Sequence, residues 1–246
     1  MALHYRTCGF VIKKKDNGEA DRVFTIFSQD FGKIKVIGKA IRKIASKLKG
    51  GIDIFYLSEI EFIQGKAYKT LTDAIVLKKF KNIGENLIRL KVFHKIAESF
   101  DLLRTEEKDE ELWNLLNGTL KKLEKDSLST EEYLLIYYYF LWNLFFILGY
   151  KPELFHCVIC QKKLNPSNLY FSSDEGGAIC NLCLNKAENI IKINSDLVKI
   201  LRLISEKDWQ TIIKLKIQSF SLKLLKEVSE DYYFHLFSVH SLKDDF

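Results

Sequence analysis

Three motifs that would mark a nucleotide-using or hydrolytic enzyme are absent from these 246 residues. The chain contains neither a Gly-x-x-x-x-Gly-Lys-[Ser/Thr] loop nor a Gly-x-Gly-x-x-Gly turn, the usual phosphate cradles. The Gly-x-Ser-x-Gly elbow of the hydrolases is missing as well. Adjacent acids such as Glu131 and Glu132 stand where a helix would begin, and the helix dipole explains them without catalysis. We therefore expect a protein that is not an enzyme.

Segments for export or membrane insertion are also lacking. The N-terminal residues carry no apolar signal core before the charges at Lys13, Lys14 and Lys15. The most apolar run, residues 133–148, is shorter than the ~20 residues that cross a bilayer, and it contains several tyrosines. The sequence therefore predicts a cytoplasmic protein with reduced cysteines and no membrane partner.

Four of the five cysteines form two Cys-x-x-Cys pairs, Cys157/Cys160 and Cys180/Cys183. A two-residue gap lets both sulfurs of a pair point into one tight turn, and two such turns supply four thiolates for a tetrahedral metal. The alternatives are two disulfides, a redox pair or unrelated buried cysteines. We predict one structural Zn²⁺ in a small module at about residues 155–184, which is too small to fold without it.

Other residues near this motif fit a catalytic metal poorly. A zinc deaminase needs a His-x-Glu, and the chain has none. His156 could replace one cysteine, but its position outside the turn favours a surface or supporting role. Cys8 lies in an apolar run far from the pairs, and we interpret it as a small buried hydrophobe.

Positive charge is concentrated in the first third of the chain. Residues 1–81 hold 17 Lys and Arg against 8 Asp and Glu, whereas residues 82–246 hold 21 against 24. Such asymmetry indicates a polyanionic partner, most simply nucleic acid, because clustered cations release counterions from phosphates. The alternative is a solvated basic face.

The same third has the pattern of an all-β domain. Turn residues at 16–18, 31–33 and 64–66 separate short runs of alternating or β-branched residues. Five strands with one longer connection, between the third and the fourth, predict a small closed barrel of the OB type. The expected strands cover residues 4–15, 23–27, 33–36, 53–64 and 69–79.

The long connection, residues 39–49, is strongly basic. It contains no acid, and its cations are Lys39, Arg42, Lys43, Lys47 and Lys49. As a helix it would be amphipathic, and as a loop it would be a polycationic arm. In either form it could follow a phosphate backbone.

From Gly84 the apolar periodicity becomes helical. Helices are expected over residues 85–104, 109–125 and 130–148, the last with a capping box at Ser129, and again over 195–240. The predicted class is α+β with two domains: a barrel over residues 1–81, and a helical domain over residues 82–246 that carries the inserted cysteine module.

The order of these features resembles the bacterial recombination and repair family RecO along nearly the whole chain. The matching stretches are Tyr5-Arg6-Thr7, Gly18-Glu19-Ala20-Asp21-Arg22, Phe31-Gly32-Lys33, the basic segment from Lys39 to Gly51, Leu148-Gly149-Tyr150 with Pro152-Glu153-Leu154, and the two cysteine pairs. Each stretch is common by itself, but their order is specific to this family.

The resemblance implies a non-enzymatic protein that binds single- and double-stranded DNA through its OB-fold and anneals complementary strands. It implies RecR, single-strand-binding protein and RecF as partners in loading recombinase, and a nucleoid-associated location in the bacterial cytoplasm. The four cysteines are implied as ligands of a structural metal. The DNA contacts implied or indicated by charge are Arg6, Lys33, Lys35, Lys39, Arg42, Lys43, Lys47 and Lys49. The alternative is a zinc-containing scaffold that binds RNA or the ribosome.

Overall fold

The computed structural model describes residues 3–101, 103, 107–126, 128–215 and 217–241. The chain divides into two compact units, residues 1–128 and 129–246. The first unit continues past the strands because three helices pack on them, so it is longer than the barrel segment expected from the sequence. The predicted functional division near residue 82 stays a prediction.

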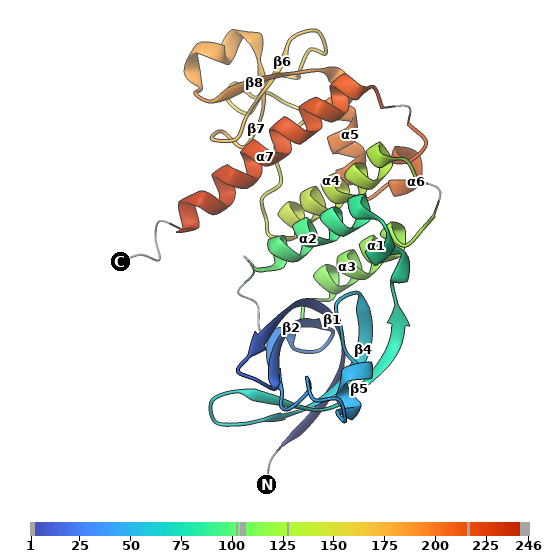
Figure 1. Cartoon of the computed structure of the whole chain (residues 1–246). Coiled ribbons are helices and arrows are strands. Elements are labelled where there is room, and N and C mark those ends of the chain that lie inside the picture. The colour runs from blue at the N-terminus through green and yellow to red at the C-terminus, as the bar shows by residue number, and fades with distance from the viewer. Residues whose placement is uncertain (1–2, 102, 104–106, 127, 216, 242–246) are drawn as a thin grey trace. The chain divides into compact units, whose positions relative to one another are not determined.

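Five strands form the predicted closed barrel in the first unit, in the order β1-β2-β3-β5-β4 (Figure 1). Neighbouring strands are antiparallel except for β3 and β5, which run parallel. The strands are β1 (His4–Asn17), β2 (Asp21–Ser28), β3 (Gly32–Gly38), β4 (Tyr56–Gln64) and β5 (Lys69–Lys79). All five expected strands are present. Position 18 is a glycine because the turn after β1 takes a left-handed backbone with a φ of +61° there.

Alternating side chains fill the barrel. On β3, Ile34 and Val36 are buried, whereas Lys35 between them is exposed. Phe24 and Ile26 of β2 and Phe62 of β4 belong to the same cluster. This period of two confirms the alternation expected from the sequence.

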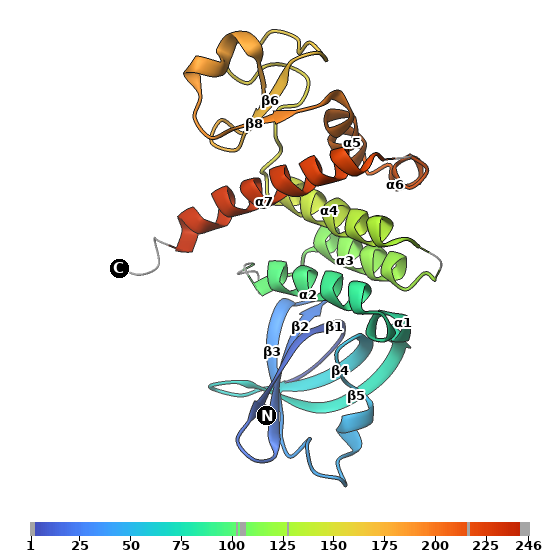
Figure 2. The same cartoon turned by 45° about the horizontal axis from the view of Figure 1, so that its top comes forward.

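Three helices cover one end of the barrel: α1 (Lys81–Glu85), α2 (Leu87–Asp101) and α3 (Glu110–Leu123). Aromatic rings join them to the strands. Phe27 of β2 meets Phe100 of α2 with ring centroids 4.8 Å apart, and Phe10 of β1 meets Trp113 of α3 at 4.9 Å. Figure 2 shows α2 lying across this end of the barrel. The sequence predicted one helix over residues 85–104. Most of that range is α2, whereas Glu85 ends α1, and residues 102 and 104 lie outside the described part of the chain.

The second unit is built around α4 (Thr130–Ile147), which begins with the predicted capping box. Ser129 Oγ accepts a hydrogen bond from the Glu132 N–H, and the Glu132 carboxylate accepts one from the Ser129 N–H. The helix is buried on nearly every side, as its apolar sequence predicts. Within the described residues, every helix is too short or too polar to span a bilayer.

The remaining elements of this unit are a small sheet and further helices. The elements are β6 (Leu169–Ser172), β7 (Gly177–Cys180), β8 (Ile190–Ile193), α5 (Ser195–Ser205), α6 (Trp209–Ile212) and α7 (Ser219–Ser241). The β6–β7 hairpin lies within the segment predicted to form the cysteine module. The strand β8 was not predicted, and it pairs with the other edge of β6.

Trp142 of α4 lies at the centre of the second unit. Its ring is fully buried, stacks on Tyr232 of α7 at 5.2 Å and meets Phe171 of β6 edge-on at 6.3 Å. Its indole Nε1 donates to Ser229 Oγ over 2.8 Å. One side chain therefore joins α4, α7 and the small sheet, and satisfies its own polar atom.

We predict that Trp142→Ala lowers the free energy of unfolding of this unit by about 3 to 5 kcal/mol, because it opens a cavity where three elements meet. Chemical denaturation of the full chain measures the effect. The control is Phe234→Ala on α7, where the ring is 70% exposed and the change should stay within about 0.5 kcal/mol. Equal losses for the two variants would contradict this role of Trp142.

Candidate metal centre and nucleic-acid interface

The two cysteine pairs come together in the second unit. Cys157 and Cys160 lie in a turn in which the Gln161 N–H donates to the Cys157 carbonyl over 2.9 Å. Gln161 adopts a left-handed backbone with a φ of 59°, which reverses the chain after the pair. Cys180 ends β7, and Cys183 lies in the short 3₁₀ helix Asn181–Lys186. The β6–β7 hairpin thus brings the second cysteine pair beside the first.

The four sulfurs have the geometry of one tetrahedral metal site. All four Sγ atoms lie within 4.8 Å of one another, and those of Cys160 and Cys180 are 3.8 Å apart. A four-coordinate ion with metal–sulfur bonds of about 2.3 Å would hold its sulfurs about 3.8 Å apart. No disulfide joins these cysteines. His156 is not part of the cluster and lies 4.0 Å from the Glu153 carboxylate.

Backbone groups and burial shift the pKa values of two of these thiols in opposite directions. Burial by itself raises the pKa of the Cys157 thiol, but N–H groups of Cys160, Cys180 and Ile159 lower that pKa to about 6. Burial and the neighbouring thiols raise the pKa of Cys183 to about 12. Four thiols this close cannot all ionise against one another, so a bound cation is what would allow all four to be thiolates.

The cysteine module has a very small core of its own. Its fully buried apolar cluster consists of Cys157, Ile179 and Cys183, with partly buried neighbours around them. Backbone pairing ties the module to the preceding segment: the Glu153 N–H donates to the Gly176 carbonyl over 3.0 Å, and the Ala178 N–H donates to the Glu153 carbonyl over 2.8 Å. A core of this size cannot offset the entropy of folding without further help.

The basic connection between β3 and β4 is a set of turns that ends in the 3₁₀ helix Lys47–Gly50. Of the two forms left open by the sequence, it is therefore the loop. Ile41 is buried in the barrel core and Leu48 packs against it. The Ala40 N–H donates to Asp21 Oδ1 over 2.7 Å, and the Arg42 N–H to the Ala20 carbonyl over 3.0 Å. These contacts give the loop a defined path.

The cationic side chains of this loop differ in their interaction partners. Arg42 Nε lies 3.5 Å from Asp16 Oδ2, and Arg42 also donates to the Gly18 carbonyl over 3.1 Å. Lys39 Nζ lies 5.5 Å from the centre of the Tyr68 ring. Within the described part of the chain, no hydrogen bond or ion pair holds the exposed side chains of Lys35, Lys43, Lys47 and Lys49.

Two other predicted contact residues have protein partners. Lys33 Nζ donates to the Phe100 carbonyl over 3.0 Å, which satisfies the C-terminal part of α2. Arg6 lies on β1 with its Nε 3.6 Å from the Glu59 carboxylate of β4. Arg6 is thus on the side of the barrel where β1 meets β4, whereas Lys35 is on β3. The structure does not bring Arg6 together with the basic loop, and its role in DNA binding stays a prediction.

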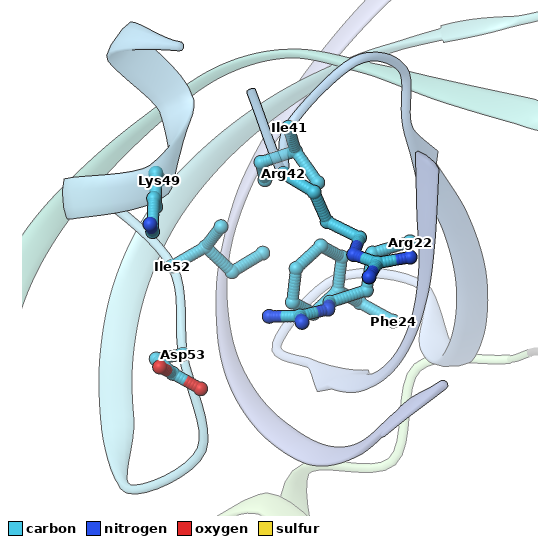
Figure 3. A pocket seen from close by; sticks show the side chains of 7 residues that line it. All are labelled: Arg22, Phe24, Ile41, Arg42, Lys49, Ile52 and Asp53. Atoms are coloured by element: carbon cyan, nitrogen blue, oxygen red, sulfur yellow. The ribbon is translucent and has the colours of Figure 1, made fainter. Parts of the chain in front are cut away.

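A hollow of about 230 Å³ opens where the basic loop crosses the barrel (Figure 3). Its lining residues are Arg22, Phe24, Ile41, Arg42, Lys49, Ile52 and Asp53. Asp16 lies beside two of these cations, and the hydrogen bond from Arg22 Nε over 2.7 Å lowers the pKa of its carboxyl. Asp53 is paired in turn with Lys14 over 2.5 Å. Cationic groups thus converge here from β2 and from both ends of the loop.

Sequence reasoning missed the aromatic residue of this surface. Tyr68 lies in the turn between β4 and β5 and meets Lys39 of the loop. The residues 64–66 were assigned only as a turn. The parallel pairing of Val36 with Lys69 is what brings this turn beside β3, and such a long-range pairing leaves no local signal in the sequence.

Comparisons with known proteins agree on one family. Residues 1–93 match the model "Recombination protein O N terminal", and residues 99–243 match "Recombination protein O C terminal". The chain is 35% identical to DNA repair protein RecO of Dehalococcoides mccartyi strain 195 over 214 residues, which are 87% of this chain and 83% of that protein. It is 31% identical to DNA repair protein RecO of Alkaliphilus metalliredigens over 92% of this chain and 91% of that protein.

We predict that Gly177→Ala weakens the docking of the cysteine module. An added Cβ would lie 2.6 Å from the carbonyl oxygen of Glu153 and 2.8 Å from its nitrogen, so the backbone would have to move. The expected loss is about 1 to 3 kcal/mol of unfolding free energy.

The control for this variant is Gly118→Ala in α3, where the nearest atom to a new Cβ is a flexible lysine Nζ at 3.6 Å. That change should stabilise by about 0.5 to 1 kcal/mol, because glycine is unfavourable inside a helix. Chemical denaturation measures both. A stabilising effect of Gly177→Ala would contradict this prediction, because it would show that a Cβ fits beside the Glu153 backbone.

Proposed function

This chain belongs to the RecO family of DNA repair and recombination proteins, and we propose that it binds DNA through its basic barrel and anneals complementary strands. The family resemblance found in the sequence is confirmed. The expectation that the chain is not an enzyme agrees with this membership, because RecO proteins are non-enzymatic recombination mediators.

The observation that carries the DNA proposal is the basic loop after β3. Its apolar residues Ile41 and Leu48 pack on the barrel core, whereas Lys43, Lys47 and Lys49 are exposed and have no carboxylate partner among the described residues. Exposed cations that are not neutralised internally gain free energy when they replace the counterions of a phosphate chain. Lys35 of β3 and Lys39 extend the same basic surface toward the β4–β5 turn.

The proposed DNA contacts are accordingly Lys35, Lys39, Arg42, Lys43, Lys47 and Lys49. We assign Lys33 a structural role, because its Nζ donates a hydrogen bond to the Phe100 carbonyl. A cationic surface accelerates annealing because it keeps two polyanionic strands at high local concentration, and this needs no nucleotide hydrolysis. We extend the proposal to RecR, single-strand-binding protein and RecF as partners on family membership alone.

We also propose that the four cysteines hold one Zn²⁺ with a structural role. Cys157, Cys160, Cys180 and Cys183 form a closed all-sulfur set, which leaves no coordination position for a substrate or water. The ion would supply the folding free energy that the small core of the module lacks. This site would not take part in DNA chemistry.

The annealing activity is tested with complementary single strands and no ATP. Wild type should shorten the annealing time, and neutralising Lys39, Arg42 and Lys43 together should remove most of the effect. The same triple change should reduce the slope of log affinity against log salt by about 2, at ~0.7 for each phosphate contact on a single strand. The loss should be similar for different base sequences.

The control for the triple variant neutralises Lys214, Lys223 and Lys226, three exposed lysines of the second unit. It removes the same charge from a surface that is not proposed to bind DNA. Equal losses in both triple variants would mean that net charge, and not the basic loop, carries the binding. Tight RNA binding without any acceleration of annealing would favour the RNA-binding scaffold.

We predict one zinc per chain, measured by elemental analysis of the purified protein. Cys157→Ser or Cys180→Ser should lower the zinc content and the thermal stability, while salt-dependent DNA binding by the basic loop persists. Purified protein without any tetrahedral metal would refute the site. Loss of DNA binding in a folded cysteine variant would instead make the module a contact surface.

A further inference from the structure

The turn between β4 and β5 presents an aromatic ring beside the basic loop. Tyr68 is 46% exposed although it is a large apolar side chain. The Gly65 N–H donates to the Tyr68 carbonyl over 3.0 Å, and a Cβ at position 65 would lie 2.8 Å from that oxygen. Glycine at position 65 thus allows a tight turn with a defined position for the ring. Figure 2 shows this hairpin extending outward from the barrel.

One lysine contacts this ring, and a second lies close to it in the strand pairing. Lys39 Nζ lies 5.5 Å from the ring centre, in the range of a cation–π contact. Lys35 and Tyr68 immediately precede Val36 and Lys69, which are partners in the parallel pairing of β3 and β5. The exposed Lys35 of β3 and the exposed Tyr68 just before β5 therefore lie at the same level of the barrel. The acidic residues nearest to Tyr68 along the hairpin are Glu61 and Asp73. They are partners in the pairing of β4 and β5 at a level farther from the turn.

We propose that Tyr68 is a stacking platform for an unpaired base, and that it gives this surface a preference for single-stranded over double-stranded DNA. The inference rests on the proposed DNA binding and deepens it. A ligand that suits an exposed aromatic ring among lysines must offer flat apolar groups between negative charges, and a single strand does so. In a duplex the base faces are covered by their neighbours, so only the phosphates remain available to this surface.

Lys39 connects the two parts of this site. Its ammonium group lies over the ring and belongs to the basic loop that we propose to follow the phosphates. Charge loss at Lys39 should therefore weaken binding to both forms of DNA, whereas loss of the ring should weaken binding to single strands alone.

The test compares Tyr68→Ala with wild type on a labelled oligo-dT and on a duplex of the same length. The affinity for oligo-dT should fall by about 5- to 140-fold, the range for loss of one base–aromatic contact. The affinity for duplex should change less than twofold. The salt slope should not change on either ligand, because no phosphate contact is lost. Tyr68→Phe should retain the single-strand affinity.

Tyr56 provides a matched control on the same pair of strands. Its ring also lies under a lysine, with Lys79 Nζ 4.8 Å from the ring centre, and the two residues are partners at the opposite end of β4 and β5. Tyr56→Ala should leave the oligo-dT affinity within twofold of wild type. Thermal unfolding of each variant checks that the barrel remains folded.

The outcomes separate this inference from the proposed function. If wild type binds oligo-dT but Tyr68→Ala binds it equally well, the stacking platform is wrong and DNA binding stands. If Tyr68→Ala loses affinity for single strands and duplex equally, the ring acts on the shape of the turn and the proposed preference is refuted. If wild type binds neither ligand, the proposed function itself fails.

Discussion

The parallel pairing of β3 with β5 is the constraint on which the barrel and its basic surface both depend. It consists of two residue pairs, Val36 with Lys69 and Ile37 with Thr70, in a barrel otherwise closed by antiparallel strands. The pairing closes the sheet, and so removes the free edges that an open sheet would expose. It also brings the β4–β5 turn beside the end of β3, where the basic loop begins. The contact between Lys39 and Tyr68 is a consequence of that closure.

The second unit depends on a different kind of constraint. Its helices have a large apolar core around Trp142, but the cysteine module has almost none. Phe171 of β6 joins the sheet to that core, and Arg202 of α5 donates to the Leu154 carbonyl while it stacks over Phe155. The module is thus held at one end by packing, and its four sulfurs are placed to hold the proposed ion. Metal binding by the sulfurs and docking at that end are expected to support each other.

Local patterns were enough to predict most of the elements. Alternation at Ile34 and Val36 identified β3, the Ser129 and Glu132 pair identified the start of α4, and cysteine spacing identified the sulfur cluster. These signals are local because they arise from the strand period, from two capping residues three positions apart and from cysteines separated by two residues. The strand β8 lacked such a signal, since its four residues form a strand only because the edge of β6 is available. The packing of three helices on the barrel depends on long-range contacts in the same way, for example those of Phe100 and Trp113 with the strands.

Partners of individual cations could not be predicted from the sequence, and they decide which cations are available to a ligand. Lys33 and Lys35 have the same place in the strand pattern, yet Lys33 holds the Phe100 carbonyl, whereas Lys35 is exposed. Arg6 and Arg42 both lie close to carboxylates, but only Arg42 belongs to the loop. Counting charges over residues 1–81 therefore indicated a polyanionic ligand without locating its site. The proposed location depends on the tertiary structure, which pairs Lys33 and Arg6 with other groups of the protein and leaves Lys35, Lys43, Lys47 and Lys49 exposed.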